Sequence, residues 1–409
     1  NNGAFLTDIN LSGDILSTDG NGMYVFHDAT GFSSVGDLNV TTSGRIQGHY
    51  YGINLNNQLR GDINLSINAP VQADTWAGIY VTGYGDINLN ASADIRGEEN
   101  GVVLASSPVY GGMANVVAEA GISGNTATGM SVYGNVDTIE VNNVAGATDG
   151  LLIQHNGTLA ATLTTNGTVT GSTGDGIFLR GYFADPALSS ILTVSSTSIV
   201  EGGRAGVRSA GDYNYYTGET TYSGLAIANH GIIRNISGSS ADLAVLGSPI
   251  DSSESSASFD IDNYGTIVGT VYFGQYDDVV TNHGVWNMAG GTSDFGAGDN
   301  TVANLPDAVF IAANDGSSAE TTQIANIASF ANGGEVRLAD GSAGDQLFLG
   351  GNYIGNGGLI TLETALGDDA SPTDMLTISG DTSGSSNVRV VNVGGAGGPT
   401  VGGIRIIDV

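Results

Sequence analysis

The stretch Gly52-Ile53-Asn54-Leu55 is followed by Asp62-Ile63-Asn64-Leu65, and both phrases return together as Gly78-Ile79-Tyr80-Val81 and Asp86-Ile87-Asn88-Leu89. In each phrase apolar residues alternate with other residues, which is typical of a short β-strand with one buried face. Recurrence of such strands at a nearly fixed interval indicates a repeat architecture, in which each unit buries its apolar face against its neighbours.

The phrase that begins with glycine continues far beyond this stretch. Its eight glycines are Gly22, Gly52, Gly78, Gly101, Gly129, Gly150, Gly176 and Gly206. The intervals between them run from 21 to 30 residues and average about 26. A propeller blade needs about 40 to 50 residues, and no segment here has the spacing of an amphipathic helix. The period therefore predicts an all-β parallel β-helix, in which each coil lays two or three strands on the coil below.

Corner residues are expected to be Gly and Asn, because both tolerate a positive φ angle. In the later part of the chain the corners read Asn-x-Gly, as in Asn229-His230-Gly231, Asn263-Tyr264-Gly265 and Asn282-His283-Gly284. Aliphatic side chains between the corners are expected to point inward and to stack along the axis. The coils should extend past residue 300.

Composition excludes several classes of function. The 409 residues include 41 acidic and 10 basic ones, all of them Arg, for a net charge of -31. Without Lys there is no Walker phosphate loop, and a polyanion is repelled by nucleic acid, so no nucleic-acid partner is expected. Without Cys there is no thiol catalysis and no disulfide. The start at Asn1-Asn2-Gly3 and the lack of a long apolar run predict a mature or trimmed soluble segment.

The last hundred residues carry a family resemblance. From Leu305 the strands lengthen, and glycine-rich phrases follow in a fixed order. They include Gly350-Gly351-Asn352-Tyr353-Ile354-Gly355, Ser371-Pro372-Thr373-Asp374-Met375-Leu376-Thr377-Ile378, Gly380-Asp381-Thr382-Ser383-Gly384 and Gly403-Ile404-Arg405-Ile406-Ile407-Asp408-Val409. This series resembles the C-terminal passenger region of pertactin-like Gram-negative autotransporters.

The resemblance implies a right-handed, single-stranded parallel β-helix with a C-terminal β capping region of the autochaperone type. We expect passenger coils over residues 1–305 and C-terminal coils with the cap over residues 306–409. It also implies display on the cell surface, with anchoring to the outer membrane through a C-terminal membrane β-barrel of the full-length precursor. That barrel is absent from this sequence, which is therefore expected to be a passenger fragment.

The expected function is adhesion without catalysis. The partner would be a protein or glycan of the host cell surface or extracellular matrix, or a second copy of the chain. Two alternatives remain: a surface polysaccharide lyase or hydrolase, and an inert stalk that carries a missing N-terminal effector. No cofactor is expected, although the acidic surface could bind divalent cations loosely.

Aromatic residues outside the core are the candidate binding residues. The third position of the glycine phrase should face solvent, which would expose Tyr24, Tyr80 and Phe178. An insertion from Ser209 to Ser223 carries Tyr213, Tyr215, Tyr216 and Tyr222, and such a Tyr-rich composition is typical of recognition loops. The alternative is structural: the stripe would stabilise the coils, and the loop tyrosines would lie flat on them.

Other motifs point to structural roles. Arg60-Gly61-Asp62 spells the integrin-binding tripeptide, but its Gly-Asp also belongs to the repeat phrase. Arg204, Arg208 and Asp212, and the pair Asp277-Asp278, could belong to an acidic-polysaccharide enzyme, yet no Lys is present as a base and adjacent acids are common in this chain. The five His residues have no metal-ligand spacing. No catalytic residue and no metal ligand is predicted.

Overall fold

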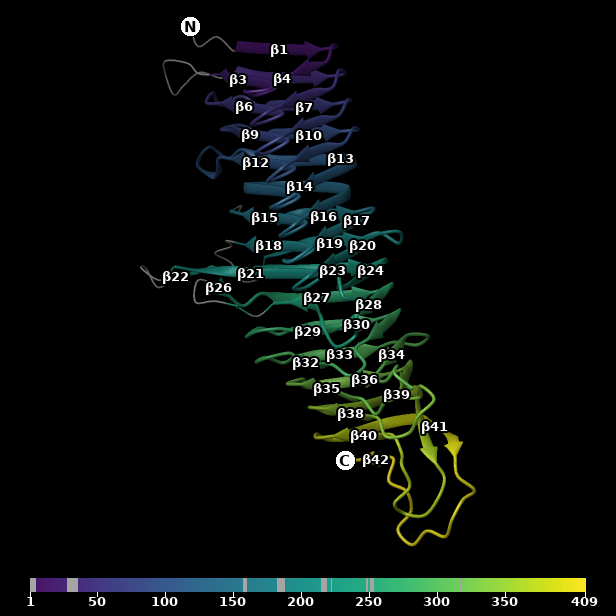
Figure 1. Ribbon diagram of the computed structural model, residues 1–409. Helices are drawn as coiled ribbons and strands as arrows, with labels where there is room; N and C mark the ends of the chain where they lie inside the picture. The colour runs from purple at the N-terminus through teal and green to yellow at the C-terminus, as the bar shows by residue number, and fades with distance from the viewer. Residues whose placement is uncertain are drawn as a thin grey trace. The chain divides into compact units, whose positions relative to one another are not determined.

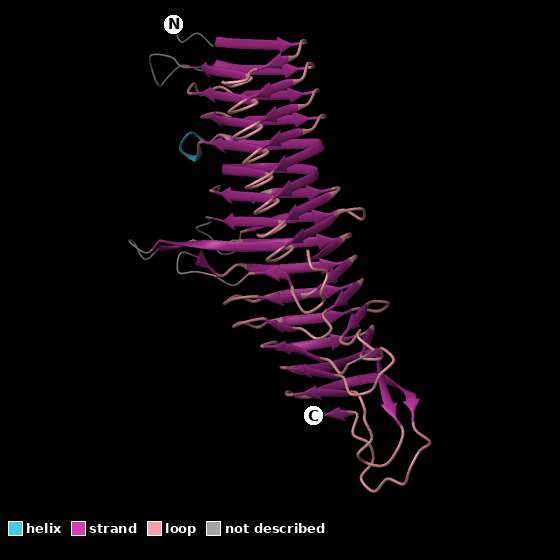
Figure 2. Ribbon diagram, in the orientation of Figure 1, coloured by secondary structure: helices cyan, strands magenta, loops and turns pink. Residues whose placement is uncertain are grey.

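The computed structural model describes residues 5–27, 36–156, 160–181, 188–214, 219–221, 223–247, 249–250, 254–316 and 318–409. These residues form two compact units. Unit 1 contains residues 1–224 and 250–255, and unit 2 contains residues 225–249 and 256–409. Apart from turns and loops, the described chain forms β-strands, with one short helical turn at η1 (Pro108–Tyr110) (Figure 2). Within the described residues, no helix is long and apolar enough to cross a membrane.

Each coil of unit 1 contributes strands to three faces, and strands of successive coils pair in parallel (Figure 1). The first face contains β1 (Phe5–Leu11), β4 (Gly36–Thr42), β7 (Ile63–Ile67), β10 (Ile87–Ala91), β13 (Met113–Gly124), β14 (Met130–Gly146), β16 (Thr162–Thr165) and β19 (Ser189–Val194). The second face contains β2 (Ile15–Leu16), β5 (Ile46–Gly48), β8 (Val71–Ala73), β11 (Ile95–Gly97), further parts of β13 and β14, β17 (Thr168–Gly171) and β20 (Ile199–Gly202). The third face contains β3 (Met23–His27), β6 (Ile53–Asn57), β9 (Ile79–Gly83), β12 (Val102–Ser106), the start of β14, β15 (Leu151–His155), β18 (Ile177–Gly181) and β21 (Val207–Asn214).

Unit 2 repeats the three-face plan. One face contains β23 (Gly224–Asn229), β27 (Ser258–Asn263), β30 (Val279–Asn282), β33 (Thr301–Asn304), β36 (Ser329–Asn332), β39 (Asn352–Ala365) and β41 (Thr382–Gly394). A second contains β24 (Ile232–Asn235), β28 (Thr266–Val268), β31 (Val285–Asn287), β34 (Val309–Ile311), β37 (Glu335–Arg337) and the later parts of β39 and β41. The third contains β25 (Leu243–Leu246), β29 (Thr270–Tyr272), β32 (Thr292–Asp294), β35 (Thr321–Ala325), β38 (Gln346–Leu349), β40 (Met375–Ile378) and β42 (Ile407–Asp408). The predicted all-β parallel β-helix is confirmed.

In the phrase that begins with glycine, equivalent residues of successive copies lie opposite each other in the structure. Tyr24 lies opposite Asn54, which lies opposite Tyr80, and the same column continues to Phe178 and Arg208. The phrase that begins with aspartate also occurs as Asp8-Ile9-Asn10-Leu11 and Asp37-Leu38-Asn39-Val40. Equivalent residues of this phrase lie opposite each other from β4 to β10, but not between β1 and β4. There Asp8, rather than Asn10, lies opposite Asn39, a shift of two residues that leaves the inward and outward faces unchanged.

The two units have different cores. Unit 1 stacks aliphatic side chains, such as Leu38, Ile63 and Ile87, which are fully buried. In unit 2 aromatic rings stack from coil to coil, with ring centroids 4.9 Å apart for Phe259 and Phe273. A second aromatic column begins at Trp286, whose Nε1 donates a hydrogen bond of 3.0 Å to the carbonyl oxygen of Gly269. The expectation of aliphatic ladders therefore holds for unit 1, whereas unit 2 also uses aromatic ones.

The repeat glycines are required by crowding and not by a positive φ angle. None of the eight phrase glycines is among the described residues with positive φ. A Cβ atom on Gly101 would instead lie 2.5 Å from the carbonyl oxygen of Gly129, in the next coil. The corner asparagines also keep negative φ angles, so the expectation of positive φ at these corners is wrong. Close approach of successive backbones explains the glycine.

Candidate binding site

A groove of about 410 Å³ lies on unit 1, at the corner between the second and third faces. It spans four successive coils, and three of them contribute aromatic side chains. Tyr51 precedes β6, Trp76 precedes β9, Tyr80 lies within β9, and Tyr133 lies within β14. The floor is formed by small side chains such as Ala77 and Ala105. Because the aromatic residues lie on strands or directly before them, their rings are held by the backbone ladder.

The rings around the groove form a continuous chain of contacts. The Trp76 ring centroid lies 5.0 Å from that of Tyr50 and 5.1 Å from that of Tyr51, and Tyr51 lies 5.4 Å from Tyr80. Trp76 is 41% exposed and Tyr50 is 39% exposed. The outer rings of this cluster are therefore open to a ligand, while the inner ones support them.

The polar groups of the groove are uncharged or acidic. Glu99 and Asn100 line it, and none of the described lining residues is basic. Burial raises the pKa of the Tyr51 hydroxyl, and Tyr80 and Glu99 raise it further. The Tyr51 phenol therefore stays protonated at neutral pH and can donate a hydrogen bond. A surface of this kind suits a ligand without negative charge.

Of the three aromatic residues predicted on the third face, the structure places only Tyr80 at the groove. Tyr24 is 60% exposed, but it lies two coils away, with Asn54 between it and Tyr80. Phe178 is only 9% exposed, so the expectation that it faces solvent is wrong. The predicted exposed column is therefore interrupted.

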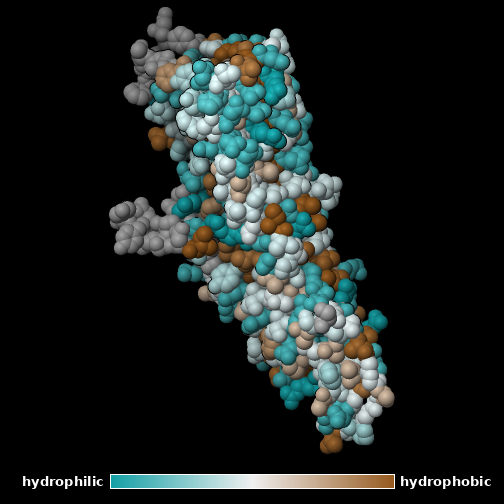
Figure 3. Space-filling model, viewed as in Figure 1, coloured by the Kyte–Doolittle hydropathy of each residue, from teal (hydrophilic) through white to brown (hydrophobic). Residues whose placement is uncertain are grey.

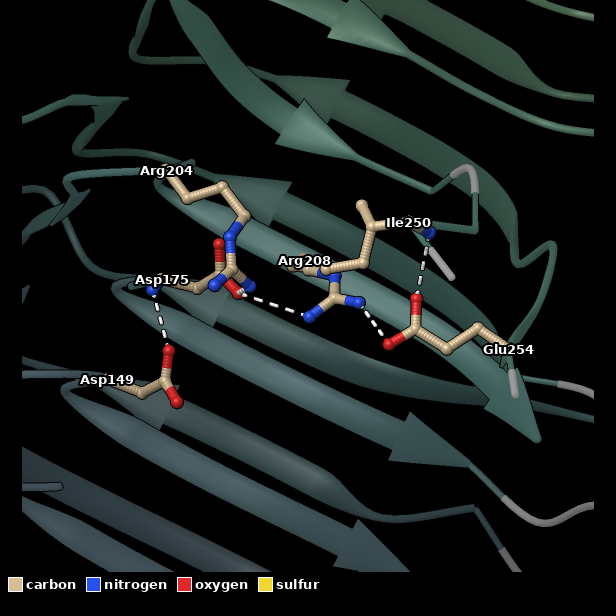
Figure 4. A network of polar contacts seen from close by, with 6 residues as sticks. All are labelled: Asp149, Asp175, Arg204, Arg208, Ile250 and Glu254. Carbon is tan, nitrogen blue, oxygen red and sulfur yellow. Dashed lines mark hydrogen bonds and ion pairs between the residues drawn. The ribbon is translucent and has the colours of Figure 1, made fainter. Parts of the chain in front are cut away.

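Phe178 is buried because the Arg208 guanidinium covers its ring, and Figure 4 shows the polar network that holds Arg208. The Arg208 guanidinium lies 4.1 Å from the centroid of the Phe178 ring and is itself only 2% exposed. Arg208 donates a hydrogen bond to Glu254, and its Nη1 lies 3.6 Å from Asp175 Oδ2. Glu254 also accepts the backbone N–H of Ile250 at 3.0 Å. These contacts attach residues 250–255 to unit 1, and β26 (Glu254–Ser255) pairs antiparallel with β21.

Comparison with known proteins identifies the family of the C-terminal part of the chain. Residues 308–409 match the sequence model of the Autochaperone Domain Type 1 family. The chain is 33% identical over 161 residues, 38% of its length, to the probable autotransporter YfaL of Escherichia coli strain K12, covering 12% of that protein. It is 45% identical over 78 residues, 19% of its length, to the adhesin BmaC autotransporter of Brucella suis, covering 2% of it. It is 46% identical over 69 residues, 17% of its length, to the autotransporter adhesin AIDA-I of Escherichia coli, covering 5% of it.

The chain is a segment of an autotransporter passenger. It spans between 2% and 15% of the length of the curated relatives it matches. No solved structure matches it. As a passenger it is presented at the surface of a Gram-negative cell and belongs to a precursor anchored to the outer membrane. The predicted division at residues 305 and 306 stays a prediction.

Part of the tyrosine-rich insertion of the passenger lies outside the described residues. This applies to Tyr215, Tyr216 and Tyr222 and to the side chain of Tyr213. The backbone of Tyr213 lies in β21, opposite Thr220 of β22 (Glu219–Thr220), in an antiparallel pair. Their role in binding stays a prediction.

The Arg60-Gly61-Asp62 tripeptide is built into the coil stack. The Asp62 carboxylate accepts the backbone N–H of Asp86 at 3.0 Å, just as Asp37 accepts that of Asp62. Gly61 is buried, and the exposed Arg60 lies 4.9 Å from the centroid of the Tyr110 ring. The Gly-Asp part of the motif thus links one coil to the next.

The acidic and basic residues considered for polysaccharide cleavage are engaged with protein groups. Arg204 donates to Asp175 at 3.0 Å. Asp277 accepts the N–H of Asp299 at 2.8 Å, and the buried Asp278 accepts that of Phe259 at 2.7 Å. The side chain of Asp212 lies outside the described part. Neither group lines the aromatic groove.

Sequence reasoning missed Tyr51 and Trp76, which line the groove, and Tyr50, whose ring contacts that of Trp76. A signal for them was present. Tyr50 and Trp76 each stand two residues before a repeat glycine, at equivalent positions of successive coils. The N–H of Trp76 donates to the carbonyl oxygen of Tyr50 at 3.0 Å, which fixes this alignment. Aligning the corners as well as the strands would have brought the two rings together.

Proposed function

We propose that this passenger segment is an adhesin without catalytic activity, and that the aromatic groove binds a neutral glycan. The observation that carries the proposal is the continuous aromatic surface of Tyr50, Trp76, Tyr51 and Tyr80. Flat rings offer large contact area at low entropic cost, and nearby polar groups can fix the orientation of a ligand.

The charge of the groove supports a neutral ligand. Glu99 and Asn100 can accept hydrogen bonds from hydroxyl groups, whereas no described lining residue could pair with a sulfate or a carboxylate. A net charge of -31 adds repulsion against polyanions. Another hollow of about 580 Å³ contains Arg45 and Arg96, but no aromatic residue lines it. It therefore lacks the stacking surface that favours the groove.

The shallow groove implies weak binding by each copy. Many passengers on one cell would act together, because linked weak contacts raise the overall avidity by orders of magnitude. Two relatives are named as adhesins, which supports a binding role over catalysis. The engagement of Asp175, Asp277 and Asp278 with protein groups also supports a role without chemistry.

The test is binding of the purified chain, immobilised on beads, to a panel of neutral and acidic glycans. Trp76→Ala and Tyr80→Ala should each weaken binding to a neutral glycan about tenfold, since truncation of a central aromatic contact costs more than about 1 kcal/mol. Tyr272→Ala is the matched control, because Tyr272 is 43% exposed and lies on unit 2. This control variant should bind like the unmodified chain.

Other results would overturn the proposal. Unchanged glycan binding by both groove variants would remove the groove from the function. Loss only in a variant with Tyr213, Tyr215, Tyr216 and Tyr222 changed to Ser would assign binding to the insertion instead. Bead clumping without glycan would indicate a second copy of the chain as the partner. New reducing ends or unsaturated sugars after incubation with polysaccharides would make the chain an enzyme.

A further inference from the structure

Three acidic residues converge at one corner of unit 2. Glu320 directly precedes β35, Asp345 directly precedes β38, and Asp340 lies in the loop between β37 and β38. One carboxylate oxygen from each residue lies within 4.8 Å of those of the other two. Oxygens that share a calcium ion at about 2.3 to 2.6 Å can be no farther apart than about 5 Å. The three carboxylates are thus spaced as ligands of one ion.

Two buried oxygen atoms of this cluster have no hydrogen-bond partner. Asp345 is fully buried, and its Oδ1 accepts the backbone N–H of Glu320 at 2.7 Å, whereas its Oδ2 accepts nothing. Asp340 Oδ1 accepts the N–H of Ser342 at 3.0 Å, and its Oδ2 is also without a partner. A buried carboxylate oxygen without a donor is costly, and two such atoms within one cluster of three carboxylates point to a missing ligand there.

The surroundings of the cluster add negative charge and no compensating cation. Asp374 Oδ1 accepts the N–H of Asp345 at 3.1 Å, and Glu363 accepts the N–H of Asp340 at 2.9 Å, so two more carboxylates lie next to the first three. In the described part of the chain no Arg forms an ion pair with Glu320, Asp340 or Asp345. Burial, together with the charges of Asp340, Asp374 and Glu320, raises the pKa of Asp345 to about 7. A bound cation would relieve this repulsion.

We propose that Glu320, Asp340 and Asp345 form a calcium site in the C-terminal coils of the passenger. The ligands are all carboxylate oxygens, which hard cations prefer, and no described His lies among them. Glu320 and Asp340 are half-buried, which leaves room for water to complete the coordination shell. Calcium fits better than magnesium, because it accepts irregular geometry and magnesium demands a near-ideal octahedron.

The site couples ion binding to folding. Its ligands lie in two successive coils and meet only when β35 and β38 pair, as Thr321 does with Gln346. A ligand that binds only the folded chain stabilises it by mass action. Because the three residues lie within the region matched by the autochaperone family, calcium should stabilise that region. This inference does not depend on what the aromatic groove binds.

The test is calorimetric titration of the chelator-treated whole chain with calcium chloride, and with magnesium chloride for comparison. One calcium site per chain is expected, with magnesium at least tenfold weaker. Asp345→Asn and Asp340→Asn should each weaken that site at least tenfold. Asp299→Asn, which removes an exposed charge elsewhere in unit 2, should leave it intact.

A second readout guards against misfolding of the variants. Calcium should raise the thermal midpoint of the unmodified chain and of Asp299→Asn by several degrees, but not that of Asp340→Asn, whose circular dichroism should be unchanged. Absence of a saturable site would overturn the proposal. Equal weakening by Asp299→Asn would indicate only diffuse binding to an acidic surface, and equal affinity for magnesium would refute the choice of calcium.

Discussion

At the scale of single residues, crowding between the backbones of successive coils determines which positions must be glycine. A Cβ atom on Gly129 would lie 2.7 Å from the carbonyl oxygens of Ala145 and Gly150, which belong to the backbone of the next coil and cannot easily move. Gly129→Ala should therefore lower the stability of unit 1 by about 2 kcal/mol or more, as overpacking does. A Cβ on Gly13 would meet nothing within 4 Å, so Gly13→Ala should be close to neutral. Thermal midpoints of the two variants measure the difference, and equal midpoints would contradict the crowding explanation.

A buried aspartate should make unit 2 more stable in acid. Burial and repulsion from Asp277 raise the pKa of Asp278 from 3.8 to about 7, although the hydrogen bond from the Phe259 N–H lowers it. The folded chain thus holds a proton that the unfolded chain releases at lower pH. The resulting stability is fully present below about pH 4 and is lost as the pH rises through 7.

The corresponding measurement is the thermal midpoint between pH 4 and pH 8. For the unmodified chain it should fall over this range. Asp278→Asn keeps an oxygen that can accept the Phe259 N–H and removes the titration, so its midpoint should fall less. A parallel fall in both proteins would show that Asp278 does not contribute.

At the scale of elements, asparagine ladders serve two different purposes. In unit 2 the buried Asn229, Asn263, Asn282, Asn304 and Asn332 donate from one amide to the next at 2.7 to 2.9 Å. On the outer surface of unit 1, Asn39, Asn64 and Asn88 do the same at 2.8 Å. The geometry is similar, but only the inner ladder is shielded from water.

Loss of one amide should therefore cost far more inside than outside. Asn282→Ala leaves a buried acceptor on Asn304 without its donor, which should cost about 1 to 3 kcal/mol. In Asn64→Ala, the amides of Asn39 and Asn88 can form hydrogen bonds with water instead. This substitution should therefore change the stability by no more than about 0.5 kcal/mol. Denaturant midpoints of the two variants give the comparison. Equal losses would mean that the ladders do not differ in solvation.

The strands and their register could be predicted from the sequence because the repeat phrase carries them. The alternation of apolar and other residues in Gly78-Ile79-Tyr80-Val81 predicts which side chains point inward. The repeated glycine predicts which residues of successive coils lie opposite each other. Burial of Phe178 could not be predicted, because Arg208, which covers its ring, is held in place by Glu254, far along the chain. The proposed calcium site could not be predicted for a similar reason. Its ligands come from two coils, and they do not recur at the interval of the repeat. Non-repeating contacts leave no periodic signal.

At the scale of the whole chain, acidic residues outnumber basic ones by 41 to 10. On the face of unit 1 seen in Figure 3, apolar side chains form only small separate patches. A chain of this charge should stay soluble and resist contact with its own copies at low salt. Attraction to a partner must then come from local surfaces such as the aromatic groove.

The family match predicts an order of stability along the chain. If residues 308–409 act as a folding template, they should be the last to lose structure, since solenoid stability is a sum over neighbouring coils. Limited proteolysis of the whole chain at rising denaturant should cut the preceding coils first. Early cleavage within residues 308–409 would contradict the template role.

The path of the chain between the units limits how this passenger can be divided. The backbone leaves unit 1 at residue 224, returns for residues 250–255 and then departs again. Scission at any bond from 225 to 249 would leave Glu254 on the fragment that lacks its partner Arg208. Truncations intended to isolate the first unit must therefore keep the chain through Ser255, because an N-terminal fragment ending sooner would leave the Arg208 guanidinium over Phe178 without Glu254 and, among the described residues, with only Asp175, 3.6 Å away, as an acidic neighbour.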